Sequence, residues 1–358
     1  MTRDSEIDFL RCVMNYMIVV MHAWAAFQYV DHTTLEFASC TIICEFLCAM
    51  ALPTFFIISG YLMFQHFDLQ SIGKKLIRRL RRLVVPYLVW NVTFVLFYLM
   101  LARCVPRLSV RVSGFGLDTW SGAIEKIVSL TIAPIDGPLW FLRALVYLSL
   151  LSPLLWLGLR VSRGIPFVVL TLVWGWGEWH FRLVDGLSGI LPAFAIGCYV
   201  LGAWVSTRGF RIFDLFRAWP WLAVGIVAFV IRCGLVLPCF QDQPVVDWVW
   251  MANTYLQIAL APTLVSLVGL THVDRWVGVD NHVYKYLKDM SFFAYAGHFM
   301  FCSVYLHALA PMLGGMTTGK MTLLILAFVG LGVPTMAVVY GVGRKICPQI
   351  LKLWDGTL

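Results

Sequence analysis

The residues best suited to chemistry lie in the first apolar stretch, where Arg11 is followed by ten residues and then by His22. At about 100° per residue, a helix places both side chains within about 20° of one face, about 16 Å apart along its axis. A polar stripe inside a membrane faces protein or a water-filled cavity. An imidazole there can act as a general base or carry an acyl group for one step. We therefore predict that His22 and Arg11 are catalytic; the alternative is that His22 bonds a backbone carbonyl while Arg11 reaches the headgroups.

A carboxylate at matching depth is the candidate partner of this histidine. Counting about 1.5 Å per residue from the expected membrane edges places His22 and Glu45 each about 12 Å below the outer surface, on helices expected to be antiparallel neighbours. A carboxylate beside an imidazole holds its tautomer and raises its basicity. Glu45 is therefore a predicted catalytic residue, and the alternative is a protonated glutamate bonded to a carbonyl.

Basic residues at both ends of later spans could bind an anionic substrate. Arg78, Arg79 and Arg82 belong to a cluster that precedes the third apolar span. This cluster suits phosphate groups, because a guanidinium binds them with two parallel hydrogen bonds, or it is a topology anchor beside anionic lipid. Arg143 enters a span about five residues below the outer surface, where it either reaches the headgroups or faces a cavity and stabilises negative charge.

Three further residues are candidates for the functional site. His298 lies about 10 Å from the inner face by the same counting, either in helix packing or in the wall of a tunnel for the donor. Glu178 and His180 fall in a predicted outer loop and would suit recognition of a polar acceptor. The sequence contains no Gly-rich phosphate loop and no cysteine pair at zinc spacing, so we predict no metal site.

Composition determines the class of protein that must position these residues. Of the 358 residues, 60% are hydrophobic and only 13% are charged, and the mean hydropathy is +0.82. Soluble domains have about a quarter charged residues, so a polytopic membrane protein is predicted. The net charge of +8 is explained by basic cytoplasmic loops rather than by nucleic-acid binding. Cys104 and Cys239 fall in or near outer loops and could pair in an oxidising compartment.

We expect an all-α integral membrane protein of about ten transmembrane helices, formed by residues 1–358 as a single domain and a single bundle with an internal donor cavity. The apolar spans lie at roughly 9–30, 37–64, 83–102, 137–158, 165–182, 186–205, 219–237, 248–270, 291–313 and 321–343. With a cytoplasmic N-terminus, 18 of the 27 Lys and Arg residues are cytoplasmic, which predicts that both termini are inside. The outer segment 103–136 is expected to carry a short interfacial helix near residues 120–132.

Five ordered blocks of the sequence resemble one known family, the membrane-bound acyltransferase 3 family. The blocks are Ile7 to Arg11 with ten residues before His22, Pro53 to Tyr61, Arg78 to Tyr87, Pro138 to Arg143, and Ser291 to His298. The resemblance covers nearly the whole chain. It implies a multi-pass enzyme of the cell inner membrane that transfers acetyl from cytoplasmic acetyl-CoA to a hydroxyl of a surface glycan or a lipid-linked sugar.

The resemblance also implies roles for residues. Arg11 and His22 would be the essential pair, and the basic cluster with Arg143 would help to hold the coenzyme A donor, whereas Glu45 is inferred from depth alone. We expect no hydrolase-like or racemase domain of the kind fused to some relatives, which leaves the acceptor open. Acetyl-CoA, the glycan acceptor and membrane lipid are the expected partners, and the oligomeric state is open, including a homo-oligomer. Competing interpretations are a polysaccharide or small-molecule exporter, in which His22 and Glu45 relay protons, and a membrane sensor that retains the fold.

Overall fold

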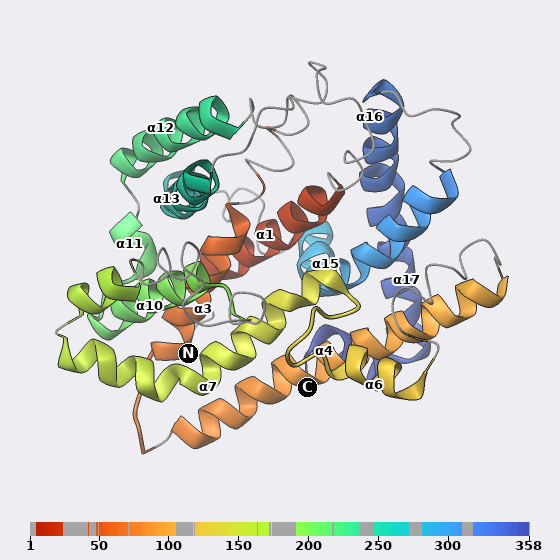
Figure 1. Cartoon of the computed structure of the whole chain (residues 1–358), viewed down its shortest axis with the longest axis horizontal. Helices are drawn as coiled ribbons and strands as arrows, with labels where there is room; N and C mark the ends of the chain where they lie inside the picture. The colour runs from red at the N-terminus through yellow and green to blue at the C-terminus, as the bar shows by residue number, and fades with distance from the viewer. Residues whose placement is uncertain are drawn as a thin grey trace.

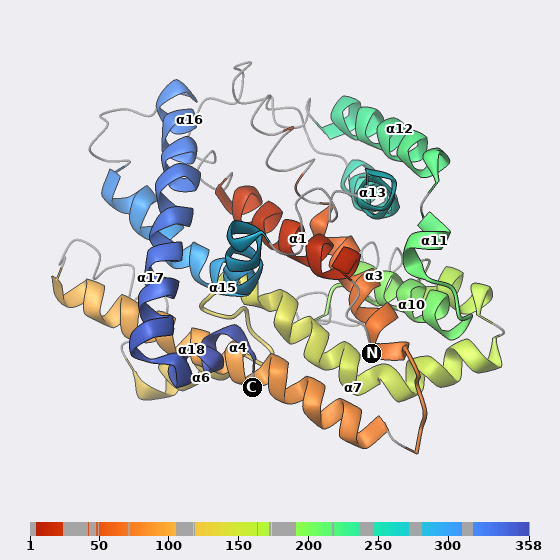
Figure 2. The same cartoon turned by 180° about the vertical axis from the view of Figure 1, so that it is seen from behind.

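The computed structural model describes residues 5–23, 42, 48, 50–70, 72–104, 117, 119–162, 164–171, 173, 191–216, 218–236, 247–271, 281–309 and 318–357. Within these ranges all regular secondary structure is helical, as predicted. The helices cross one another at several angles, and those far apart in sequence lie side by side (Figures 1 and 2).

Helix α1 (Ser5–Ala23) occupies the centre of the molecule (Figure 1). Leu10, Met14 and Ile18 repeat every four residues and are completely or almost completely buried, because that spacing places them on one face of a helix. The helix packs mainly against α15 (His282–Leu309), and also against α3 (Ala51–Phe64). The segment with the predicted catalytic histidine is therefore held on several sides by distant parts of the chain.

Helices α3 and α10 (Ala193–Thr207) cross at very short range. A Cβ atom added to Gly60 would lie 2.0 Å from the carbonyl oxygen of Tyr199, and one added to Gly202 would lie 1.8 Å from that of Ile57. Only glycine permits two helix backbones to come so close. Gly60 and Gly202 therefore permit this close helix crossing.

Two long helices pack beside each other, α4 (Ile72–Cys104) and α7 (Trp140–Val161). The 3-10 turn η4 (Gly137–Leu139) leads into α7, and the short helix α6 (Trp120–Val128) packs on α4. The segment 103–136 thus carries a short helix where the sequence predicted one, and its outer location stays a prediction.

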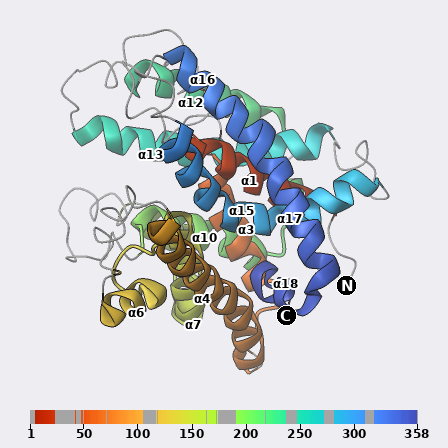
Figure 3. The ribbon, with the colours of Figure 1, turned by 90° about the vertical axis from the view of Figure 1, so that its right-hand side faces the viewer.

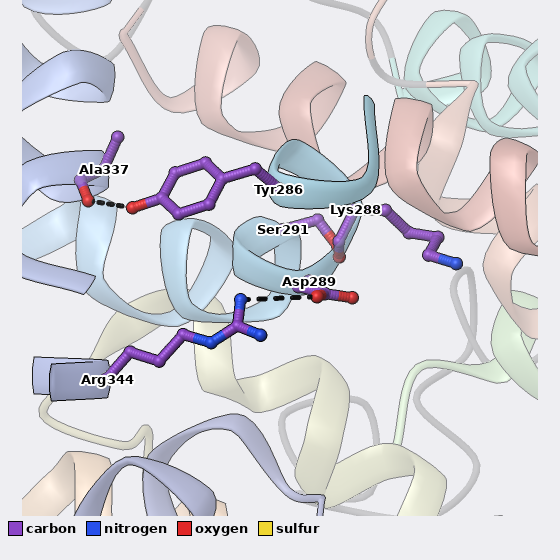
Figure 4. Close-up of polar contacts among 6 residues, drawn as sticks. All are labelled: Tyr286, Lys288, Asp289, Ser291, Ala337 and Arg344. Carbon is purple, nitrogen blue, oxygen red and sulfur yellow. Dashed lines mark hydrogen bonds and ion pairs between the residues drawn. The ribbon is translucent and has the colours of Figure 1, made fainter. Parts of the chain in front are cut away.

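The remaining helices form two groups. Helices α11 (Ile212–Phe216), α12 (Trp219–Val236) and α13 (Asp247–Thr271) pack together. Helix α16 (Thr318–Ala327) continues through the π-helix η7 (Phe328–Gly332) into α17 (Val333–Ile346) as one rod (Figure 3), followed by α18 (Pro348–Asp355). Two contacts fix α17 on α15 (Figure 4): the Tyr286 hydroxyl donates to the Ala337 carbonyl, and Arg344 lies 3.7 Å from the Asp289 carboxylate.

Two helices of the described ranges are long and apolar enough to cross a membrane, Ile72–Cys104 and Gly137–Val161. Four shorter apolar helices lie at Ala51–Phe64, Phe194–Thr207, Trp219–Gly234 and Tyr255–Leu270. The all-helical class is confirmed over the described ranges. The count of ten spans and the inside location of both termini stay predictions.

Candidate active site

His22 lies in the last turn of α1, with its side chain partly buried. Its Nδ1 atom is 2.9 Å from the Ile18 carbonyl oxygen. A carbonyl oxygen can only accept a hydrogen bond, so Nδ1 carries the proton and Nε2 keeps its lone pair. The carbonyl contact that was the structural alternative for His22 is therefore present, and it prepares the other ring nitrogen to act as a base.

A second imidazole faces this one from α15. His298 is fully buried, and its ring centroid lies 4.9 Å from that of His22, with 52° between the ring planes. Its Nδ1 atom bonds the Tyr295 carbonyl, and its Nε2 atom is buried with no hydrogen-bond partner. By the same argument, His298 is also protonated on Nδ1. The two rings thus both present unprotonated Nε2 atoms.

Contacts on either side fix the distance between the two rings. Near the middle of α1, the Asn15 amide donates to the Ser291 hydroxyl at 3.1 Å. At its end, the Cys302 thiol lies 3.8 Å from the His22 carbonyl oxygen. Sequence-based depth counting separated His22 and His298, because it started from residue 291, whereas α15 begins at His282.

Arg11 lies on the same helix as His22, in its second turn. Its side chain is exposed, and eleven residues of helix separate the two positions by about 16 Å along the axis. The predicted spacing is therefore correct. The geometry makes Arg11 suitable for holding a distant part of a long substrate rather than for touching the group that reacts at His22.

The three arginines of the basic cluster that are predicted to bind the donor divide into two kinds. Arg79 is tied into the fold, since its Nε donates to the Ser149 hydroxyl at 2.9 Å and its Nη2 donates to the Ser59 carbonyl at 3.2 Å. Arg78 and Arg82 are exposed on α4. Their guanidinium groups are accessible and fit the phosphate groups of a coenzyme A donor, whereas Arg79 joins α4 to α3 and α7.

Arg143 is buried at the start of α7, with 4% of its surface exposed. Its Nη1 donates to the carbonyl oxygens of Ser129 and Ile132, the first at 2.9 Å. The hydroxyl of Tyr87 also points to the Ser129 carbonyl, at 3.3 Å. These contacts of Arg143 anchor the segment that leads into η4.

Glu45, Glu178, His180 and Cys239 lie outside the described residues. Within the described ranges no three His, Cys, Asp or Glu side chains cluster in a way that could hold a metal ion. The structure adds two polar residues that the sequence did not single out, Asp136 and Asn91, both fully buried. Asp136 directly precedes a Gly-Pro turn, where an aspartate ordinarily indicates a solvated turn or cap.

Comparison with known proteins identifies a similar chain. It is 32% identical over 206 residues to a succinoglycan biosynthesis protein, ExoH, of Rhizobium meliloti (strain 1021). The match covers 53% of this chain and spans only half (50%) of that protein. No solved structure matches the chain significantly. The model of an acyltransferase domain matches residues 4–344, which include the paired histidines and the basic cluster. The chain therefore belongs to the acyltransferase 3 family.

Proposed function

We propose that the protein transfers an acetyl group from cytoplasmic acetyl-CoA to a hydroxyl of a cell-surface glycan or a lipid-linked sugar, as a multi-pass enzyme of the inner membrane. The observation that carries this proposal is the unprotonated Nε2 of His22, whose tautomer is fixed by the Ile18 carbonyl and whose ring lies against His298. Membership of an acyltransferase family supports the reaction class. The relative's role in succinoglycan biosynthesis supports a polysaccharide acceptor.

In the proposed reaction, His22 accepts the proton of the acceptor hydroxyl on Nε2 while that oxygen attacks the thioester carbonyl. The carbon–sulfur bond breaks, and His22 returns the proton to the departing sulfur, so the products are an ester and a free thiol. The alternative route forms an acetyl-histidine first and then transfers the acetyl to the hydroxyl. Both routes need an unprotonated Nε2, and both conserve the proton count.

His298 supports His22 in this scheme. When His22 holds the transferred proton it is positively charged, and the neutral ring of His298 provides a lone pair beside that charge. A preorganised acceptor stabilises a charge that develops during the reaction. His298, first predicted to line the donor path, is thus proposed to stabilise the protonated His22.

Donor binding is assigned to the exposed guanidinium groups. Arg78 and Arg82 are proposed to bind the phosphates of coenzyme A at the cytoplasmic end of α4, and Arg11 to hold another part of the donor. In the same arrangement, the acceptor arrives from outside and binds at the C-terminal ends of α1 and α15. Glu45 as the carboxylate partner of His22, and Glu178 with His180 as acceptor-binding residues, remain parts of this proposal.

The test uses the purified full chain in detergent, with acetyl-CoA and a surface polysaccharide from cells that carry the protein. The polysaccharide is first stripped of esters by mild base. Wild-type protein is expected to release free thiol and to acetylate the glycan, as measured by mass spectrometry. His22→Ala should lower both by about 100-fold or more, the usual contribution of general-base catalysis. Transport of the polysaccharide without thiol release would instead support an exporter.

A further inference from the structure

A buried carboxyl group near the paired histidines has no role in the reaction outlined above. Asp136 is 0% exposed, and neither of its carboxyl oxygens has a hydrogen-bond partner. Burial of an unbonded carboxyl opposes folding, because the group loses its hydration without compensation. Such groups persist in native proteins where they have a function or bind a molecule that completes their hydrogen bonds.

Asn91 of α4 adds an unused donor beside this unused acceptor. Its Oδ1 accepts a hydrogen bond from the backbone N–H of Asp136 at 3.4 Å. The side chain is 0% exposed, and its Nδ2 has no partner. The two residues are therefore adjacent, and together they offer N–H donors and carboxyl oxygens that the protein itself leaves unbonded.

Tyr295 connects this pair to the histidines. Its hydroxyl donates to the carbonyl of Pro138 at 2.7 Å, two residues after Asp136, and its own carbonyl accepts from His298. The Phe299 ring, next along α15, would lie 3.7 Å from a Cβ atom on Gly137. The unbonded carboxyl and amide thus lie on the η4 side of the site, next to aromatic faces.

The chemistry of these groups favours a neutral, hydroxyl-rich ligand. A hydroxyl can donate to a carboxyl oxygen and accept from an amide N–H at once. Burial raises the pKa of the Asp136 carboxyl well above its usual range, so the group is uncharged and suits an uncharged ligand. The rings of Tyr295 and Phe299 lie beside the backbone of residues 137 and 138, so apolar surface flanks these polar groups.

We propose that Asp136 and Asn91 bind hydroxyl groups of the sugar acceptor and so select and orient it for acetylation. This assignment rests on the proposed function, because it places the acceptor on the η4 side of His298. Both side chains are sealed from solvent in this structure, so the segment between Ile132 and Gly137 has to shift when the sugar binds. Arg143 anchors that segment at its start, through Ser129 and Ile132.

The test uses the fact that removing the Asp136 carboxyl should raise the stability of the fold but lower the binding of the acceptor. Asp136→Leu has nearly the same shape without the unbonded oxygens, so the melting temperature should rise. Acetylation of the base-treated polysaccharide should nevertheless fall by 100-fold or more, while slow hydrolysis of acetyl-CoA without acceptor is unchanged. Asp214→Leu, which removes an exposed carboxylate on α11, is the control and should leave acetylation unchanged.

If the leucine variant does not fold, a second variant, Asp136→Asn, tests the assignment through a direct measurement of polysaccharide binding. Tryptophan fluorescence titrated with the same polysaccharide should show at least a 10-fold weaker Kd for Asp136→Asn than for wild type. Equal binding, or a leucine variant that acetylates like wild type, overturns the assignment. Because binding is measured without turnover, Asp136-dependent binding with no thiol release would reject only the proposed function.

Discussion

The imidazoles of His22 and His298 lie 4.9 Å apart across the interface between α1 and α15, and each has its Nδ1 atom on a carbonyl of its own helix. Neither ring depends on the other for its orientation. The pair is therefore preorganised by two separate helices, and any reaction at His22 takes place beside a second, neutral base.

Replacing His298 should separate its charge-stabilising role from its packing role. His298→Phe keeps an aromatic ring beside His22 but removes the Nε2 lone pair. We expect kcat for thiol release to fall about 10-fold or more, because the protonated His22 loses its neighbouring acceptor, with little change in melting temperature. Full activity in this variant would show that His298 serves packing alone.

The two exposed arginines Arg78 and Arg82 should behave differently from the partly buried Arg79. Arg78→Ala and Arg82→Ala are expected to raise KM for acetyl-CoA several-fold without changing thermal stability, because both side chains are exposed. Arg79→Ala should lower the free energy of unfolding by about 1–3 kcal/mol, since it removes charged hydrogen bonds to Ser59 and Ser149. Kinetics and thermal melts on the same samples make the comparison, and the reverse assignment would contradict it.

The glycine contacts of α3 and α10 should be intolerant of one added methyl group. Gly202→Ala places a Cβ 1.8 Å from the Ile57 carbonyl oxygen, so the helices must move apart, at a cost of about 1–3 kcal/mol or more. Gly73→Ala on α4 is the matched control, because nothing lies within 4 Å of its added Cβ. It should be neutral or stabilise by up to about 1 kcal/mol. Chemical denaturation measures both changes.

The hydrogen bond between Asn15 and Ser291 should matter for rate as well as stability. Asn15→Ala removes the bond and is expected to lower stability by about 1 kcal/mol and to lower kcat, because α1 is then less firmly placed against α15. Asn281→Ala removes the amide that caps α15, where its Oδ1 accepts from Val283 N–H at 2.9 Å. Its stability loss is similar, but it lies at the far end of α15 from His298. An equal loss of kcat in both variants would argue against a positioning role.

Sequence reasoning located helices better than it located their ends. The third apolar span was expected at 83–102, yet α4 runs from Ile72 to Cys104. Its first turns carry the basic cluster and are not apolar, so hydropathy does not mark them even though they are helical. The same effect hides the first turns of α15, which begins at His282 although the apolar span was expected from residue 291. Hydropathy reports the segment that avoids water, whereas helix length also depends on packing.

The candidate site was predictable only where one helix contains it. The spacing of Arg11 and His22 follows from helix geometry, and the structure keeps both on α1. The pairing of His22 with His298 joins distant segments and has no local signal. The roles of Arg79 and Arg143 also escaped prediction, because their partners include backbone carbonyls of other segments, which side-chain patterns do not reveal.

The contact between α1 and α15 has a consequence for synthesis of the protein. The ribosome makes His22 long before His298, because the two residues lie far apart in the sequence. A nascent polypeptide therefore holds the first imidazole without its counterpart. Truncated copies that end before α15 cannot form the pair.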